Sequence, residues 1–67
     1  MPVMKELALI GTSPVGWHEA AQEAVRTAAI TVRHIEEVEV VRLSAAVTDG
    51  AITEYRAELK VAFRLER

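Results

Sequence analysis

Cysteine is absent from this sequence, and aromatic side chains are few. Without cysteine the chain can form neither a disulfide nor a thiolate metal site. Its aromatic residues are Trp17, Tyr55 and Phe63, too few for a surface on which nucleic-acid bases stack. A net charge of -2 also argues against non-specific nucleic-acid binding, which needs a concentrated basic surface. We therefore expect no nucleic-acid partner.

Long apolar runs are absent as well. The longest is only a few residues, so no segment is long enough to cross a membrane. The segment from Met1 to Glu6 lacks the charged and then apolar pattern of a signal peptide. The expectation is a cytoplasmic protein with no membrane partner.

Apolar residues are nevertheless abundant for so short a chain. They make up 51% of the 67 residues, which form one domain over residues 1–67. The mean hydropathy is +0.15. A single sphere of this size cannot bury that much apolar surface. Small domains without disulfides often solve this problem by assembling with copies of themselves, so self-association is expected.

The first half of the chain predicts a strand and then a helix. Residues 3–10 are short, apolar and bounded by Gly11, as in a strand. Either Ser13 caps the helix, with Pro14 in its first position, or Gly16 caps it one turn later. An apolar stripe with helical spacing follows, and the helix is expected to end near His34. The stripe comprises Trp17, Ala20, Ala21, Ala24, Val25, Ala28, Val32 and Ile35.

The second half predicts a long hairpin around Asp49-Gly50, the residues that a type I′ turn favours. A two-residue turn pairs Glu39 with Lys60, on the face opposite the apolar pairs. Those pairs are Val38 with Val61 and Val40 with Leu59. The last strand is expected between the other two, with the helix across one face of the sheet. The fold class is therefore α+β.

In one strand of this hairpin, apolar side chains do not all fall on the same face. Val38 and Val40 point one way, while Val41 and Leu43 point the other. Either a bulge near Val41 switches the phase, or both faces of the strand are covered. A single chain has no second cover, because its one helix is already used. Val41 and Leu43 are therefore candidates for contact between subunits.

The order of these pieces resembles the dodecin family over almost the whole chain. Gly11-Thr12-Ser13 closes the first strand, Ala20-Ala21 follows in the helix, and the chain ends in Val61-Ala62-Phe63-Arg64-Leu65-Glu66. The resemblance implies a β-α-β-β unit whose three-stranded antiparallel sheet partly wraps one helix. It also implies assembly into a hollow homododecamer that binds or stores ligands between subunits and is not an enzyme. No catalytic constellation is visible in the sequence either.

The resemblance implies a flavin, riboflavin or FMN, as a possible cofactor. Flavin-binding dodecins sandwich the ring with a Trp of the second strand and contact its edge with a Gln of the third. In this chain those positions fall on Glu37 and Arg56, which depart from the pattern. A carboxylate offers no π-face, whereas a guanidinium can stack or bind phosphate. Alternatively, the two residues form ion pairs across a symmetry axis.

Calcium is the second ligand that the resemblance implies. Ser13-Pro14-x-x-Trp17 resembles a subgroup of dodecins that lacks the stacking Trp, some members of which are described as calcium-binding. Repeated subunits could supply Glu36, Glu37 or Glu39 around an axis, although the spacing identifies no metal ligands. The alternative function is thus a calcium-binding or purely structural shell.

Plainer interpretations apply to several of these residues. Trp17 heads an apolar stripe, so a place in the core or the subunit interface is favoured over stacking on a ligand. His18 and His34 are too far apart along one helix to share a metal. The glutamates favour a solvated or ion-paired face, and Arg56 favours an ion pair at an interface.

Overall fold

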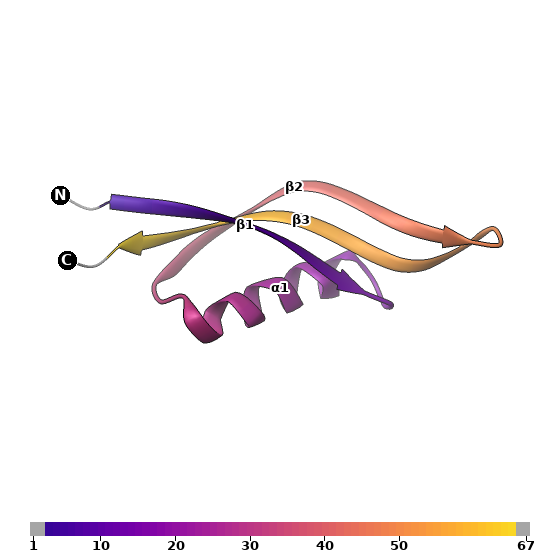
Figure 1. Cartoon of the computed structure of the whole chain (residues 1–67), viewed down its shortest axis with the longest axis horizontal. Helices are drawn as coiled ribbons and strands as arrows, with labels where there is room; N and C mark the ends of the chain where they lie inside the picture. The colour runs from indigo at the N-terminus through magenta and orange to yellow at the C-terminus, as the bar shows by residue number, and fades with distance from the viewer. Residues whose placement is uncertain (1–2, 66–67) are drawn as a thin grey trace.

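A computed structural model describes residues 3–65 as a strand, a helix and two further strands (Figure 1). The elements are β1 (Val3–Ser13), α1 (Trp17–Thr31), β2 (Ile35–Thr48) and β3 (Ala51–Leu65). The predicted β-α-β-β order and α+β class are confirmed. The single domain expected over residues 1–67 includes terminal residues outside the described range and stays a prediction.

The three strands form one antiparallel sheet in the order β1-β3-β2, as predicted. α1 lies across one face of this sheet, which we call the helix face, and packs mainly on β1 and β3. The far end of the β2–β3 hairpin extends past α1 and β1 (Figure 1). The chain is therefore elongated, with extents of 52 × 19 × 13 Å.

The start of α1 settles the choice between two predicted caps. Gly16 occupies the N-cap, and Trp17 is the first helical residue. Ser13 does not cap the helix, because its Oγ accepts a hydrogen bond of 3.0 Å from the backbone N–H of Val15. Glu19 lies in the first turn, where its charge suits the helix dipole. The later of the two predicted starts is confirmed.

α1 ends at Thr31, so the predicted end near His34 is wrong. Val32 already has extended backbone, and its N–H makes the last helical hydrogen bond, to the carbonyl of Ala28 at 2.8 Å. His34 has a φ of 63°, outside the helical region, and turns the chain into β2. No helix within residues 3–65 is long and apolar enough to cross a membrane.

The hairpin follows the predicted turn and register. Asp49 and Gly50 both have positive φ, 52° and 77°, as a type I′ turn requires. Glu39 pairs with Lys60, and the two expected valine pairs beside it are present. The register shifts by one residue near Thr53 in β3 and shifts back at Val41 in β2. These three pairs lie beyond both irregularities and therefore keep the predicted register.

Val41 is the extra residue of a bulge in β2, because the pairing passes from Val40–Leu59 to Arg42–Glu58. Of the two predicted explanations for the broken alternation, the bulge is the one found. It returns Leu43, paired with Ala57, to the helix face that Val40 also shares. Both Val41 and Leu43 remain about half exposed, at 53% and 51%.

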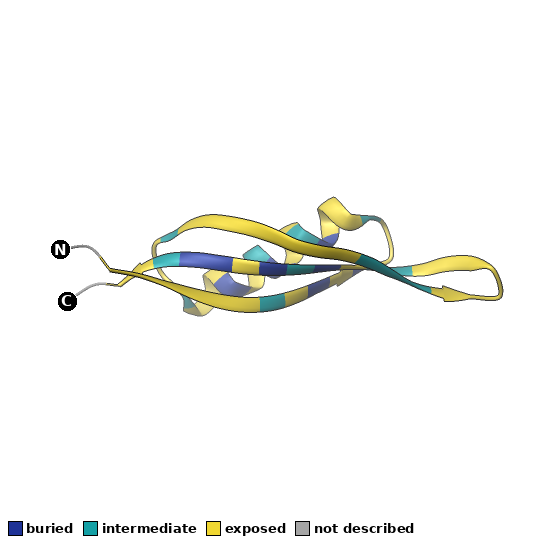
Figure 2. Cartoon of the chain, turned by 90° about the horizontal axis from the view of Figure 1, so that it is seen from above, coloured by how far each residue is buried: buried dark blue, intermediate teal, exposed yellow. Residues whose placement is uncertain are grey.

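The core between α1 and the sheet is thin and built mostly from small residues. Ala20, Ala24, Ala57 and Leu59 form one buried cluster. Figure 2 shows the buried positions along β3 and the facing side of α1, while the hairpin end is exposed. Among the described residues, Leu59 and Val61 are the largest side chains that are fully buried. So small a core contributes little stability to an isolated chain.

Candidate functional site

The face of the sheet opposite α1, which we call the open face, carries charges of both signs. Side chains alternate between the two faces of a strand, so the polar positions of β3 turn away from the helix. The pairing of β2 with β3 brings carboxylates opposite basic groups on this face. Its residues on these two strands include Glu37, Glu39, Arg42, Ser44, Glu54, Arg56, Glu58 and Lys60.

Arg56 lies centrally on the open face. It pairs with Thr12 of β1 on one side and with Ser44 of β2 on the other. Its Nε donates a hydrogen bond of 2.8 Å to Oε1 of Glu54, while half of the arginine side chain stays exposed. An ion pair this exposed contributes at most about 1 kcal/mol. The guanidinium can therefore exchange its present partner for a ligand at little cost.

A shallow hollow of about 260 Å³ adjoins this arginine. It is lined by Ile10, Arg42, Ser44, Arg56 and Glu58. The Nε of Arg42 lies 3.5 Å from a carboxylate oxygen of Glu58. Two guanidinium groups and a hydroxyl supply donors, and Glu58 supplies an acceptor. The hollow thus suits a polar or anionic group, but none of its lining residues is aromatic.

Glu37 and Arg56 share the open face but do not meet within one chain. Glu37 pairs with Ala62, whereas Arg56 lies six residues earlier on β3. At the rise of a β-strand, six residues separate Glu37 and Arg56 by roughly 20 Å along the sheet. As predicted ligand contacts they can therefore act together only if two subunits contribute one residue each. Their role in binding stays a prediction.

The glutamates considered for calcium do not converge in one chain. An oxygen of Glu36 lies 3.6 Å from a guanidinium nitrogen of Arg64, and Glu39 opposes Lys60. Across residues 3–65, no three His, Cys, Asp or Glu side chains are grouped so that they could hold a metal ion. Because calcium takes six to eight oxygen ligands, the side chains of a single chain do not fit it.

Trp17 joins the start of α1 to the hairpin on the helix face. Its Nε1 donates a hydrogen bond of 2.8 Å to the backbone carbonyl of Ser44. Its ring meets Tyr55 edge to face, with centroids 4.8 Å apart and planes at 80°. The sequence analysis predicted neither contact. The small residue opposite Tyr55, Ala45, leaves space for the indole, but an uninterrupted register from the turn would pair Tyr55 with Ser44, so the sequence alone gave no signal for this contact.

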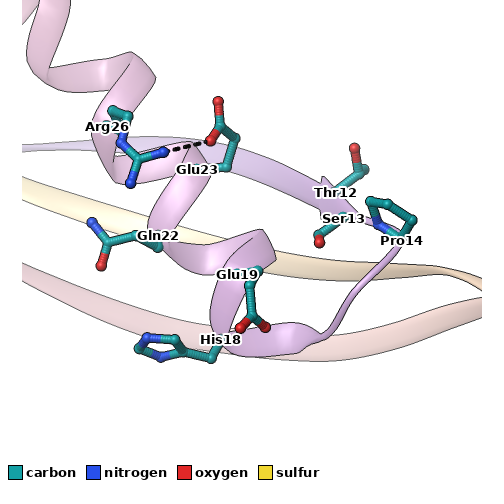
Figure 3. A pocket seen from close by; sticks show the side chains of 8 residues that line it. All are labelled: Thr12, Ser13, Pro14, His18, Glu19, Gln22, Glu23 and Arg26. Carbon is teal, nitrogen blue, oxygen red and sulfur yellow. Dashed lines mark hydrogen bonds and ion pairs between the residues drawn. The ribbon is translucent and has the colours of Figure 1, made fainter.

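A polar pocket of about 360 Å³ lies at the start of α1 (Figure 3). Its lining includes the loop residues that could suggest a phosphate loop, but Ser13 is engaged with the turn. Glu23 and Arg26 pair with each other at 3.0 Å, so their charges largely cancel. The pocket therefore contains no cluster of side chains with uncompensated charge of one sign. It is lined by Thr12, Ser13, Pro14, His18, Glu19, Gln22, Glu23 and Arg26.

The fold and these surfaces can be compared with known proteins. A family model described as Dodecin matches residues 3–66. The chain belongs to the dodecin family. The family predicted from the order of the sequence motifs is thus confirmed.

Two dodecins illustrate the similarity in sequence. The dodecin of Thermus thermophilus is 38% identical over 64 residues, which are 96% of this chain and 93% of that protein. The calcium dodecin of Mycobacterium tuberculosis is 38% identical over 65 residues, 97% of this chain and 92% of that protein. The second similarity agrees with the subgroup predicted from Ser13-Pro14-x-x-Trp17.

Solved dodecin structures share the fold. A variant of the T. thermophilus dodecin superimposes with a TM-score of 0.96 at 36% identity, covering all of both chains. The M. tuberculosis calcium dodecin superimposes with a TM-score of 0.84 at 40% identity, covering 96% of this chain and 91% of that one. That protein is described as a calcium-chelating antigen with a novel calcium-binding site.

Proposed function

We propose that this chain is a non-enzymatic binding protein that assembles with copies of itself into a hollow homododecamer and holds a small ligand between subunits. The observation that carries this proposal is the chain's large surface. One chain exposes 5027 Å². A compact monomer of this size exposes roughly 4,200 Å². The excess, roughly 800 Å², equals what one partner contributes to an interface of standard size.

Much of this surface is apolar, which favours self-assembly over solvation. Strongly apolar surface is seldom left exposed in a monomer and usually marks an interaction site. Burial of such side chains is the main favourable term in association. The large exposed apolar residues include Val3, Met4, Leu7, Ile10, Val15, Trp17, Ile30, Val38, Val40, Val41, Leu43, Val47, Ile52 and Leu65.

A flavin sandwiched between aromatic rings does not fit the residues present. Glu37 replaces the aromatic side chain expected at the start of β2. Within residues 3–65 the aromatic side chains lie on the helix face: Trp17 contacts Tyr55, and Phe63 alternates with Tyr55 along β3. The open face offers the guanidinium groups of Arg42 and Arg56 instead. A ligand here is therefore held by hydrogen bonds and charge, and flavin binding is expected to be weak.

Calcium is the second candidate ligand, favoured by similarity to a calcium dodecin along 97% of the chain. One chain does not bring enough carboxylates together, so a site requires several subunits around an axis. Glu36, Glu37 and Glu39 are the carboxylates of β2 that symmetry could gather. The relatives named above are described as dodecins or as a calcium-chelating protein, and none as an enzyme.

The test combines a mass measurement with two titrations. Light scattering on the purified protein should give the mass of twelve chains, and a monomeric mass would disprove the proposed assembly. Riboflavin and FMN are then titrated and followed by quenching of flavin fluorescence. Calcium is titrated calorimetrically into protein treated with a chelator. Calcium heat without flavin quenching would select the second ligand, and tight quenching would overturn the expectation of weak flavin binding.

A further inference from the structure

The hairpin end over residues 43–55, which we call the arm, has an apolar face without cover. In Figure 1 the arm extends past the start of α1. Trp17, the first residue of α1, contacts the arm near its base, at Ser44. Beyond that level Val47 and Ile52, which pair with each other on the helix face, are 64% and 49% exposed. Leu43, at the base of the arm, adds to the same surface.

A recess that is also largely apolar lies elsewhere on the same chain, between β1 and α1. This β1–α1 groove has a volume of about 370 Å³. Leucines of β1 and alanines of α1 form much of its surface, and threonines of α1 supply polar groups beside them. It is lined by Leu7, Leu9, Ile10, Gly11, Thr12, Glu23, Ala24, Thr27, Ala28, Thr31 and Val32.

We infer that the arm of one copy docks into the β1–α1 groove of a second copy. The inference rests on the proposed self-assembly and specifies the two surfaces that meet. The arm projects and the groove is recessed, so the two match in shape as well as in apolar character. Contact between two arms would leave both grooves open to water. Because each copy offers one arm and one groove, the contact is heterologous and repeats from chain to chain until it closes.

The far part of the arm, around Val47, cannot reach the middle of the groove in its own chain. Thr27 in the groove lies ten residues along α1 from Trp17, and Val47 lies three residues beyond Ser44 in the opposite direction. The rises of a helix and a strand place Thr27 and Val47 roughly 25 Å apart in one chain. A cross-link between them shorter than this distance must join two copies.

Because the chain contains no cysteine, thiol cross-linking can join only the cysteines that are introduced. The double variant Val47→Cys with Thr27→Cys is treated with a short bis-maleimide and separated on a denaturing gel. We expect a ladder of dimers, trimers and larger species, because each chain carries both partners. The single variants should stay monomeric on the gel. Both positions are exposed, and Ile52→Cys with Thr27→Cys repeats the test if the first pair folds poorly.

Each contrary result would reject one specific part of the proposal. A dimer band from Val47→Cys alone would show that arms meet arms. Absence of a ladder from both pairs, with light scattering still giving a large particle, would reject the arm–groove contact and leave the assembly standing. A monomeric mass for the unmodified chain would instead reject the assembly itself.

Discussion

The backbone of Gly11 lies directly against the carbonyl oxygen of Ala20, with no space between them for a side chain. A β-carbon added to Gly11 would overlap that oxygen and come within 2.9 Å of the β-carbon of Ala24. Both alanines are buried in the core. Relief of the overlap would therefore require α1 to move away from β1, so their close packing depends on this glycine.

Gly11→Ala should destabilise the protein strongly. The added methyl group meets backbone atoms that cannot rotate away, and overpacking of this kind costs about 1–3 kcal/mol. We expect a loss at the upper end of this range. Urea unfolding followed by circular dichroism measures it, at one fixed protein concentration because self-association contributes to stability.

Gly16→Ala is the matched control. Its β-carbon would come within 2.7 Å only of a carboxylate oxygen at the flexible end of Glu19. The backbone there is extended, with a φ of 178°, which any residue adopts. Loss of the preferred N-cap glycine should cost less than about 1 kcal/mol. Equal losses at Gly11 and Gly16 would contradict the packing explanation.

The sequence was sufficient for most of the fold because its local signals agree. Asp49-Gly50 specified the turn, and alternation along β3 specified the buried side of the sheet. The end of α1 was predicted too late because the apolar stripe continues to Val32 and Ile35, whereas the backbone already extends at Val32. The Gly11–Ala20 approach was not foreseen, since it depends on the distance between two packed elements.

Trp17→Phe should test the link between α1 and the hairpin. Phenylalanine keeps a ring that can meet Tyr55 but cannot donate a hydrogen bond to the carbonyl of Ser44. Loss of this bond should cost about 1 kcal/mol. Urea unfolding at fixed concentration measures the change. Tyr55→Phe is the control, because it keeps the ring contact and leaves the Trp17–Ser44 bond in place. Equal effects of the two substitutions would contradict the role of that bond.

The candidate site was less predictable than the fold. The dodecin resemblance indicated Glu37 and Arg56 as positions of interest, and the structure places both on the open face. The resemblance could not show that Arg56 already pairs with Glu54, or which groups of a second copy approach either residue. Such facts depend on side-chain conformation and on contacts between copies, neither of which a periodic pattern specifies.

Val41→Asp should break the assembly. The residue projects from a bulge and is 53% exposed in one chain, so a charge there harms a single subunit little. Burial of the same unpaired charge against a neighbour costs several kcal/mol. Leu43→Asp should act in the same way. Size-exclusion chromatography should show small species, less stable than the parent particle. Gln22→Asp, on the exposed side of α1, adds the same charge and should leave the particle intact.

The double variant Glu37→Trp with Arg56→Gln should strengthen flavin binding by at least tenfold. An indole at position 37 supplies the π-face that a carboxylate lacks, and an amide at position 56 can both donate to and accept from the edge of the ring. Riboflavin titration followed by fluorescence quenching measures the affinity.

Glu39→Trp with Arg56→Gln is the control, since residue 39 shares the open face but lies opposite Lys60 rather than Ala62. If the control gains as much affinity as the designed pair, any tryptophan on this face suffices and the site is not positioned by Glu37. If neither gains, the open face has been remodelled beyond these two positions, and the guanidinium groups of Arg42 and Arg56 then indicate an anionic or polar ligand of another class.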